Sequence, residues 1–228
     1  MKGAAPAILR ERQEARYAGR RRCRAHRRRR DLRGRRLHSK TRITVSPIAA
    51  RPGPIDRSFW VAPGRLLAGA HPVDLAPGRE LGRLDALLSA GMRTFIDLTH
   101  PDDVAPGGRK LGPYAALLAS AAHAADLAAY VRMPLLDERA PPFDLVQQVL
   151  DRIDAELALP RVVYVHCWAG RGRTGSIVGC WLERHGIASG EGVLQALRTL
   201  RHRDGALPLP CPAEEDQRQL VRGWQQGR

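Results

Sequence analysis

One stretch organises this chain: Val165-His166-Cys167-Trp168-Ala169-Gly170-Arg171-Gly172-Arg173-Thr174-Gly175. Residues 161–165, which follow a proline, are mostly β-branched or aromatic, and this composition predicts a buried strand. Residues 176–185 have apolar positions suited to a helix and end before Gly186, a common residue type at helix C-termini. Cys167 is therefore expected in a glycine-containing turn between a strand and the N-terminus of a helix.

A loop of this geometry suits a tetrahedral anion. Free backbone N–H groups and the helix dipole attract negative charge, and the same field favours the thiolate form of Cys167, a candidate nucleophile. Arg173, six residues on, can donate two parallel hydrogen bonds to phosphate oxygens, and Gly170 allows a close approach of backbone. The predicted phosphate-binding loop consists of Trp168, Ala169, Gly170, Arg171, Gly172 and Arg173.

The spacing His166-Cys167, five residues, Arg173-Thr174-Gly175 resembles the signature of the cysteine-dependent protein tyrosine and dual-specificity phosphatases. The resemblance implies an α/β fold with a central, mostly parallel sheet flanked by helices. It also implies hydrolysis of phosphomonoesters through a phosphocysteine intermediate, with no cofactor and no metal, because Arg173 and the loop amides supply the positive charge. Two alternatives stay open, a structural glycine-rich loop around a buried cysteine and a loop that binds phosphate without hydrolysing it.

The positive charge of the chain is concentrated at its N-terminus. The chain has 228 residues and a formal net charge of +15. Residues 1–45 contain 17 Lys and Arg against 3 acidic residues, and the remainder contains 21 against 20. We predict a disordered basic tail over residues 1–45 and one phosphatase-like catalytic domain over residues 46–228, long enough for an ordinary core. No apolar run typical of an export signal or a membrane span is found.

The basic tail suggests possible binding partners, and the cysteines bear on the cellular compartment of the protein. The arginines of the tail could contact nucleic acid, an anionic membrane or a targeting receptor, or the tail could be an extension without a role. The four cysteines show no paired metal spacing, and a reactive thiolate needs a reducing compartment, so a cytoplasmic location is expected. Cys180 and Cys211 are expected to be buried small hydrophobes, and a protective disulfide with Cys167 is the alternative.

The rest of the chain alternates between predicted strands and helices. Residues 59–61 and 66–70 flank a Pro-Gly turn and resemble the first hairpin of the phosphatase family. Helices are expected over residues 80–90, 113–129 and 190–203, and strands over 93–98 and 130–136. Four polar residues at or after the strand 93–98 are expected to be loop and capping groups, with direct contact to the substrate as the alternative: Asp97, His100, Asp102 and Asp103.

Asp137 is the candidate general acid. It follows a predicted strand and precedes a proline-containing loop, as the general acid of the phosphatase family does. Because loops after parallel strands open on the same edge of a sheet, Asp137 and Cys167 are expected to face one site. Asp144, with Gln147 three residues later, is predicted to cap the next helix. An aspartate that only caps or faces water, and a role for Glu138 in its place, stay open.

Three further residues acquire roles through the resemblance. Residues 210–217 are similar to the family's segment in which a glutamine orients the attacking water, and this likeness points to Gln217, with a solvent-facing helix position as the alternative. Thr174 is expected to donate a hydrogen bond to the departing sulfur. His166 is expected either to order the loop or to support the thiolate.

A phosphorylated protein is the expected substrate, by analogy with the family. Arg171 adds a second cation to the loop, and lipid-phosphate members of the superfamily also have basic residues there, so a phosphoinositide or another polyanion is the second hypothesis. Hydrolysis of an RNA 5′-phosphate is a third, because the same chemistry serves it and the basic tail could hold a nucleic-acid backbone.

Overall fold

The structure is a computed structural model, and it describes residues 48–76, 78–121, 128–202 and 209–227. The predicted basic tail of residues 1–45 lies outside the described residues.

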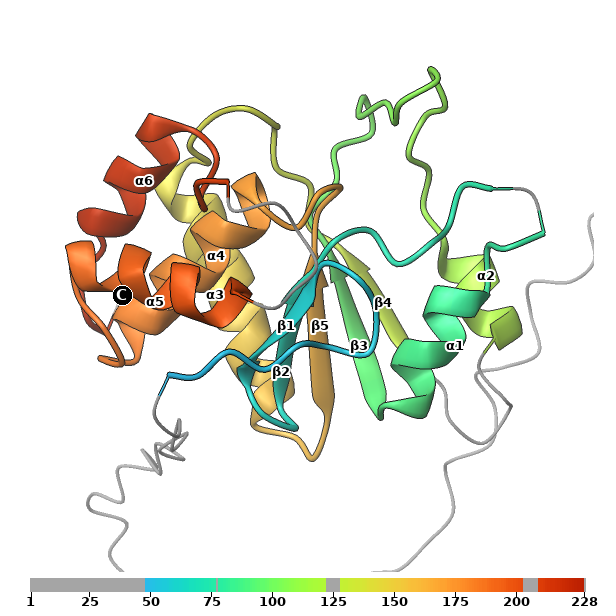
Figure 1. The fold of residues 1–228 in the computed structure, drawn as a ribbon, viewed down its shortest axis with the longest axis horizontal. Coiled ribbons are helices and arrows are strands. Elements are labelled where there is room, and N and C mark those ends of the chain that lie inside the picture. The colour runs from blue at the N-terminus through green and yellow to red at the C-terminus, as the bar shows by residue number, and fades with distance from the viewer. Residues whose placement is uncertain (1–47, 77, 122–127, 203–208, 228) are drawn as a thin grey trace, which may run out of the picture. The chain divides into compact units, whose positions relative to one another are not determined.

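The described residues form one five-stranded sheet in the order β1-β2-β5-β3-β4 (Figure 1). The strands are β1 (Ser58–Ala62), β2 (Leu66–Gly69), β3 (Met92–Asp97), β4 (Ala129–Arg132) and β5 (Val162–His166). β1 runs antiparallel to β2, whereas β2, β5, β3 and β4 run parallel to one another. The predicted α/β class with a mostly parallel sheet is therefore confirmed, and so is the first hairpin.

Helices cover both faces of this sheet. They are α1 (Gly82–Ser89), α2 (Ala115–Ala121), α3 (Phe143–Leu157), α4 (Gly172–Arg184), α5 (Glu191–Arg201) and α6 (Glu215–Arg222). Figure 1 shows α3 to α6 on one side and α1 and α2 on the other. Side chains of a strand alternate between these two layers: Ile96 and Val165 join the core under α3 to α6, and Phe95 and Tyr164 join the core under α1 and α2.

The C-terminal ends of the four parallel strands lie in one row. Gly69 pairs with His166, His166 pairs with Asp97, and Asp97 pairs with Arg132. The segments that follow these four residues therefore leave the sheet at the same edge and at the same level. This row brings residues that are far apart in the sequence to one place.

The predicted starts of two helices were wrong. α4 begins at Gly172 rather than at residue 176, because the N–H of Gly175 donates to the carbonyl of Arg171 at 3.0 Å and the polar end of the loop forms the first turn. Asp144 is not the N-cap of α3. The helix begins at Phe143, Pro142 is at the N-cap, and Asp144 lies in the first turn, where its charge is favourable to the helix dipole.

Two further boundaries also needed correction. The predicted helix 113–129 is α2 in its described part, and Ala129 belongs to β4. β4 ends at Arg132 and not at residue 136, but the chain continues beside β3. The N–H groups of Met133 and Leu135 donate to the carbonyls of Asp97 and Leu98 at 2.8 and 3.1 Å. Proline at position 134, between these donors, has no N–H group to continue the ladder.

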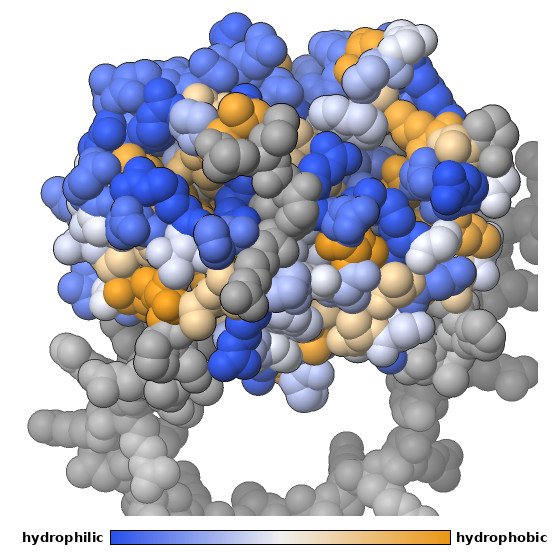
Figure 2. Space-filling view, viewed as in Figure 1, coloured by the Kyte–Doolittle hydropathy of each residue, from blue (hydrophilic) through white to orange (hydrophobic). Residues whose placement is uncertain are grey.

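The face of the molecule seen in Figure 2 is mostly hydrophilic, with apolar residues in small separate areas. Within the described residues, the large hydrophobic side chains that are exposed are Leu81, Val104, Leu136, Phe143, Leu159 and Leu209. None of the helices in this part of the chain is both long and apolar enough to cross a membrane.

Candidate active site

Cys167 is the first residue after β5 and lies just before α4. Its side chain is almost fully buried, and the first N–H groups of α4 have no partner within the helix, so they are available to an anion. Gly170 has a φ of +68°, and a Cβ at this position would lie 2.5 Å from the carbonyl carbon of Gly69. Only glycine therefore allows the loop to approach the end of β2 so closely.

The guanidinium of Arg173 is anchored by one of its ends. Its Nη1 donates to the carboxylate of Asp103 and to the carbonyl of Leu135 at 3.2 Å, with a longer contact to the carbonyl of Leu98 at 3.5 Å. These three acceptors come from segments that follow β3 and β4. They fix the plane of a side chain that has no exposed surface.

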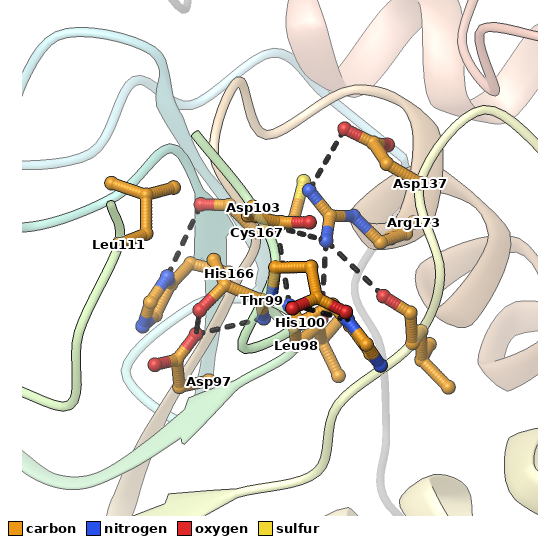
Figure 3. A network of polar contacts seen from close by, with 12 residues as sticks. Asp97, Leu98, Thr99, His100, Asp103, Leu111, Asp137, His166, Cys167 and Arg173 are labelled. Carbon is orange, nitrogen blue, oxygen red and sulfur yellow. Dashed lines mark hydrogen bonds and ion pairs between the residues drawn. The ribbon is translucent and has the colours of Figure 1, made fainter. Parts of the chain in front are cut away.

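The other edge of the Arg173 guanidinium is formed by Nη2 and Nε. Nη2 donates to Asp137 Oδ2 at 2.9 Å, whereas Nε is buried and has no hydrogen-bond partner among the described residues. Figure 3 shows the Cys167 sulfur beside the Arg173 guanidinium. A planar fork of this kind matches two oxygens of one phosphate group. The Nε and Nη2 edge can therefore receive two oxygens of a tetrahedral anion.

The negatively charged groups around Arg173 keep its guanidinium protonated. Burial acts against the charged form, but the neighbouring Cys167, Asp103 and Asp137 outweigh it and raise the pKa of Arg173. The guanidinium therefore remains a permanent cation, with one carboxylate at each end.

Asp137 reaches the site from the segment that follows β4, as expected from the parallel sheet. Half of its side chain is exposed (49%), whereas the Asp103 side chain is mostly buried (11% exposed). Asp137 is therefore accessible to solvent while it contacts Arg173. The next residue, Glu138, is exposed and has a φ of +56°, a conformation uncommon for residues other than glycine.

His166 is held in one neutral form by its two ring contacts. Burial lowers the pKa of His166 and raises the pKa of the Tyr114 hydroxyl, so the tyrosine donates to His166 Nε2 over 2.6 Å. The proton of His166 is then on Nδ1, which donates to the carbonyl of Cys167 at 3.2 Å. The neutral ring orders the backbone at Cys167 and brings no charge to its sulfur.

Asp97 is a buried capping group below the site (Figure 3). Its carboxylate accepts hydrogen bonds from the backbone and the hydroxyl of Thr99 at 2.9 and 2.7 Å and from the hydroxyl of Tyr130 at 2.6 Å. Burial alone would raise the pKa of Asp97, but these hydrogen bonds help to lower it. Of its neighbours, Asp102 is exposed, whereas Asp103 contacts Arg173 directly, a contact that the expected capping role does not include.

His71 belongs to the same buried group, and the sequence alone does not indicate it. Its backbone N–H donates to the carbonyl of Trp168 at 3.0 Å, and its ring lies edge-on to Tyr114 and His166. Burial is the largest cause that lowers the pKa of His71, to about 4. The His71 ring is therefore neutral at pH 7.

Acid is expected to destabilise the protein through His71. Below pH 6.5 the unfolded chain takes up a proton at this residue and the folded chain does not, so stability falls as the pH is lowered from 6.5 towards 4, by up to about 1.4 kcal/mol per pH unit. Urea unfolding at pH 7 and pH 5 measures this loss. The His71→Gln variant cannot titrate and should lose about 2 kcal/mol less over this interval. Equal losses in both proteins would contradict the assignment.

Gln217 is buried beside the loop and does not face solvent. A Cβ on Gly172 would lie 3.2 Å from its amide. Its Nε2 donates to the carbonyl of Arg139 at 3.1 Å, and its Oε1 accepts from the N–H of Glu214 at 3.1 Å. An amide has two N–H groups and two oxygen lone pairs, so one of each remains for a water molecule.

Four other residues of the predicted site belong to the loop or to the first turn of α4. The hydroxyl of Thr174 is buried and makes a long contact of 3.5 Å with the carbonyl of Gly69. Trp168, Ala169 and Arg171 are partly exposed, and Arg171 is the N-cap residue of α4.

The two other described cysteines are buried, as expected. Burial raises the pKa of Cys180, and the thiol of Cys211 donates to the carbonyl of Arg171 at 3.4 Å. In the part of the chain that the structure describes, no three His, Cys, Asp or Glu side chains come together as metal ligands.

Residues 80–187 match a family model described as "Polymorphic toxin system, DSP-PTPase phosphatase". A stretch of 64 residues is 36% identical to phosphatidylglycerophosphate phosphatase PTPMT1 of Arabidopsis thaliana. This stretch covers 28% of the chain and only 19% of that protein.

Solved structures share the fold at low sequence identity. PTPMT1 in complex with PI(5)P has a TM-score of 0.55 and 19% identity over 74% of this chain and 94% of that one. P. aeruginosa TpbA in complex with pTyr has a TM-score of 0.54 and 19% identity over 79% and 92%. Tk-PTP in the active form has a TM-score of 0.53 and 18% identity over 74% and 96%. At such identities the likeness concerns the arrangement of helices and strands.

Proposed function

Because residues 80–187 match the DSP-PTPase phosphatase model, we propose that the chain is a phosphatase of this kind and hydrolyses phosphomonoesters of proteins through a phosphocysteine intermediate. The observation that carries this proposal is the meeting of three groups, two from the segment after β5 and one from the segment after β4. The Arg173 guanidinium lies between the segments after β3 and β4, it is 2.9 Å from the Asp137 carboxylate, and it interacts electrostatically with Cys167. These three groups are a nucleophile, a phosphate ligand and a proton donor.

In the first step the Cys167 thiolate attacks phosphorus and the bond to the leaving oxygen breaks. The Nε and Nη2 groups of Arg173 and the amides of residues 168–173 stabilise the charge on the equatorial oxygens. Asp137 gives its proton to the leaving oxygen, so the first product departs as an alcohol or phenol. Substrate phosphate takes the place of Asp137 on Arg173, and this exchange frees the carboxyl group for proton transfer.

In the second step a water molecule hydrolyses the phosphocysteine. Asp137, now a carboxylate, accepts the proton of the water, and the remaining N–H and lone pair of Gln217 orient it. Thr174 donates a hydrogen bond to the departing sulfur once its long contact with Gly69 is given up. His166 keeps the Cys167 backbone in place throughout.

Asp137→Asn is expected to lower the turnover of a phosphotyrosine peptide by about 10² to 10⁴, because the variant has no proton for the leaving group. Inhibition by inorganic phosphate should be unchanged or stronger, because the neutral amide competes less for Arg173 Nη2. Steady-state kinetics with phosphate as inhibitor measures both effects. Turnover equal to that of the wild type would remove Asp137 from the mechanism.

A lipid phosphate is the second candidate substrate. Arg171 is a further, partly exposed cation in the loop, and the exposed Val104 and Leu136 are next in sequence to the two carboxylates on Arg173. An apolar rim with an added cation also suits a phosphate on a membrane surface. The name of the Arabidopsis relative supports the same class of substrate.

A substrate panel separates these candidates. It contains phosphotyrosine and phosphoserine peptides, vesicles with PI(5)P or phosphatidylglycerophosphate, and 5′-triphosphorylated RNA, each tested with the wild type and with Cys167→Ser. We expect the highest Cys167-dependent kcat/KM on a phosphopeptide. A higher value on vesicles would favour the lipid, and one on RNA the third hypothesis. Binding without hydrolysis of any substrate, p-nitrophenyl phosphate included, would identify a phosphate-binding module and refute the proposal.

The compartment and the tail belong to the same proposal. A nucleophilic thiolate persists in a reducing environment, so we propose a cytoplasmic location.

The basic residues 1–45 are proposed to hold an anionic membrane or nucleic acid near the domain. Salt-dependent binding of vesicles or RNA by the full chain, lost in a variant without these residues, is the expected result.

A further inference from the structure

The segment that carries Asp137 is fastened to α6. We call residues 137–140 the acid loop. The N–H of Ala140 donates to Asp216 Oδ2 at 2.7 Å, and the carbonyl of Arg139 accepts from Gln217 Nε2 at 3.1 Å. Both bonds cross from the acid loop to the first turn of a helix more than 70 residues later.

These bonds matter because the acid loop has few other supports. Residues 137–139 are exposed, so packing does not hold them. Glu138 has a φ of +56°, and a residue in this region costs on the order of 1 kcal/mol or more. The loop therefore keeps its conformation through the contact of Asp137 with Arg173 at one end and the bonds to α6 at the other.

The α6 end of this connection is itself fixed. Asp216 Oδ1 accepts from the N–H of Gln217 at 2.7 Å, and Glu214 and Gln217 form a capping box. α6 packs on α4 (Figure 1), and the methyl groups of Val221 leave no room for a Cβ on Gly179. Because α4 begins with Arg173 in its first turn, α6 ties the acid loop to the same helix that holds the phosphate.

We propose that Asp216 is a positioning residue that keeps Asp137 over the reacting phosphate. This inference rests on the proposed function. When a substrate phosphate takes Nη2 of Arg173, Asp137 loses its guanidinium partner, and one end of the acid loop is released. The bond from Ala140 to Asp216 then remains, together with that of Gln217, and it holds the carboxyl group within reach of the leaving oxygen.

Leaving-group dependence tests this role, because a proton donor matters only when the leaving group is basic. The comparison is kcat/KM for phenyl phosphate and for 2,4-dinitrophenyl phosphate, whose leaving group needs no proton. Asp216→Ala should lower the first value about tenfold and the second by no more than about twofold. Asp216→Asn keeps one acceptor oxygen for Ala140 and should restore part of the loss. Asp151→Asn, which removes another exposed carboxylate from an ion pair with Arg184, is the control.

Each outcome decides between the two proposals. If Asp216→Ala lowers kcat/KM equally for both substrates, the residue acts on the fold or on phosphate binding, and the positioning role is wrong. If the variant behaves like Asp151→Asn, the acid loop does not depend on this bond, and the inference fails while the proposed function stands. If the wild type shows no Cys167-dependent hydrolysis of either substrate, the proposed function itself fails.

Discussion

Cys167→Ser is expected to abolish turnover, with kcat lowered by at least about 10⁴-fold. A serine hydroxyl ionises far less readily than a thiol, and neither Arg173 nor the loop amides can supply a base to activate it. No other described residue is placed to take over attack on phosphorus. Release of inorganic phosphate from a phosphotyrosine peptide measures the loss.

The fold and phosphate binding of this variant should persist. Cys167 is almost fully buried at the end of β5, and serine fills nearly the same volume there. Thermal unfolding and inhibitor binding by isothermal calorimetry provide the controls. Substantial turnover by a folded Cys167→Ser variant would show that the phosphocysteine mechanism is wrong.

Arg173→Lys is expected to lower kcat/KM by about 10³-fold, although the charge is kept. A lysine ammonium is a single point. It cannot remain bound to Asp103 and to the carbonyl of Leu135 while it also presents two parallel N–H groups to the phosphate. Steady-state kinetics on a phosphotyrosine peptide measures this change.

Arg184→Lys provides the matched control at the opposite end of the same helix. Arg184 also bridges two carboxylates, those of Asp151 and Asp154, but it lies far along α4 from the phosphate loop. This variant should lose some stability and retain its kcat/KM. If both variants lost activity to the same extent, a general weakening of α4 would explain the effect of Arg173→Lys.

The sequence predicted the elements whose signals are local. β5 is an apolar run of β-branched and aromatic residues, and α5 has a clear apolar face, so both were found close to their observed bounds. α4 was predicted four residues too short because its first turn is made of the polar residues of the phosphate loop. The spacing of apolar residues, from which the helix was predicted, cannot reveal a turn that consists of polar residues and glycine.

The site was predictable where a motif or a strand end marks it. Cys167, Arg173 and Gly170 stand in the signature, and Asp137 follows a strand of a parallel sheet. The placement of Asp137 beside Arg173 agrees with the rule that such strand ends share one edge.

The remaining contacts of the site join residues far apart in the chain. Asp103 and Arg173 are 70 residues apart, and Tyr114 and His166 are 52 apart. Their meeting depends on the register of β3 against β5, which no local pattern encodes. The one available signal for His71 was its position two residues after the end of β2, at the edge of the sheet where the site lies.

The row of strand ends at Gly69, His166, Asp97 and Arg132 separates the framework of this protein from its chemistry. Each connecting segment departs from its own strand, and the two cores beneath it are made mostly by residues of the strands and helices. One segment can therefore be lengthened or exchanged while the pairing of the strands is preserved. Evolution can retune substrate preference on such a framework one segment at a time, and a protein engineer can graft a segment in the same way.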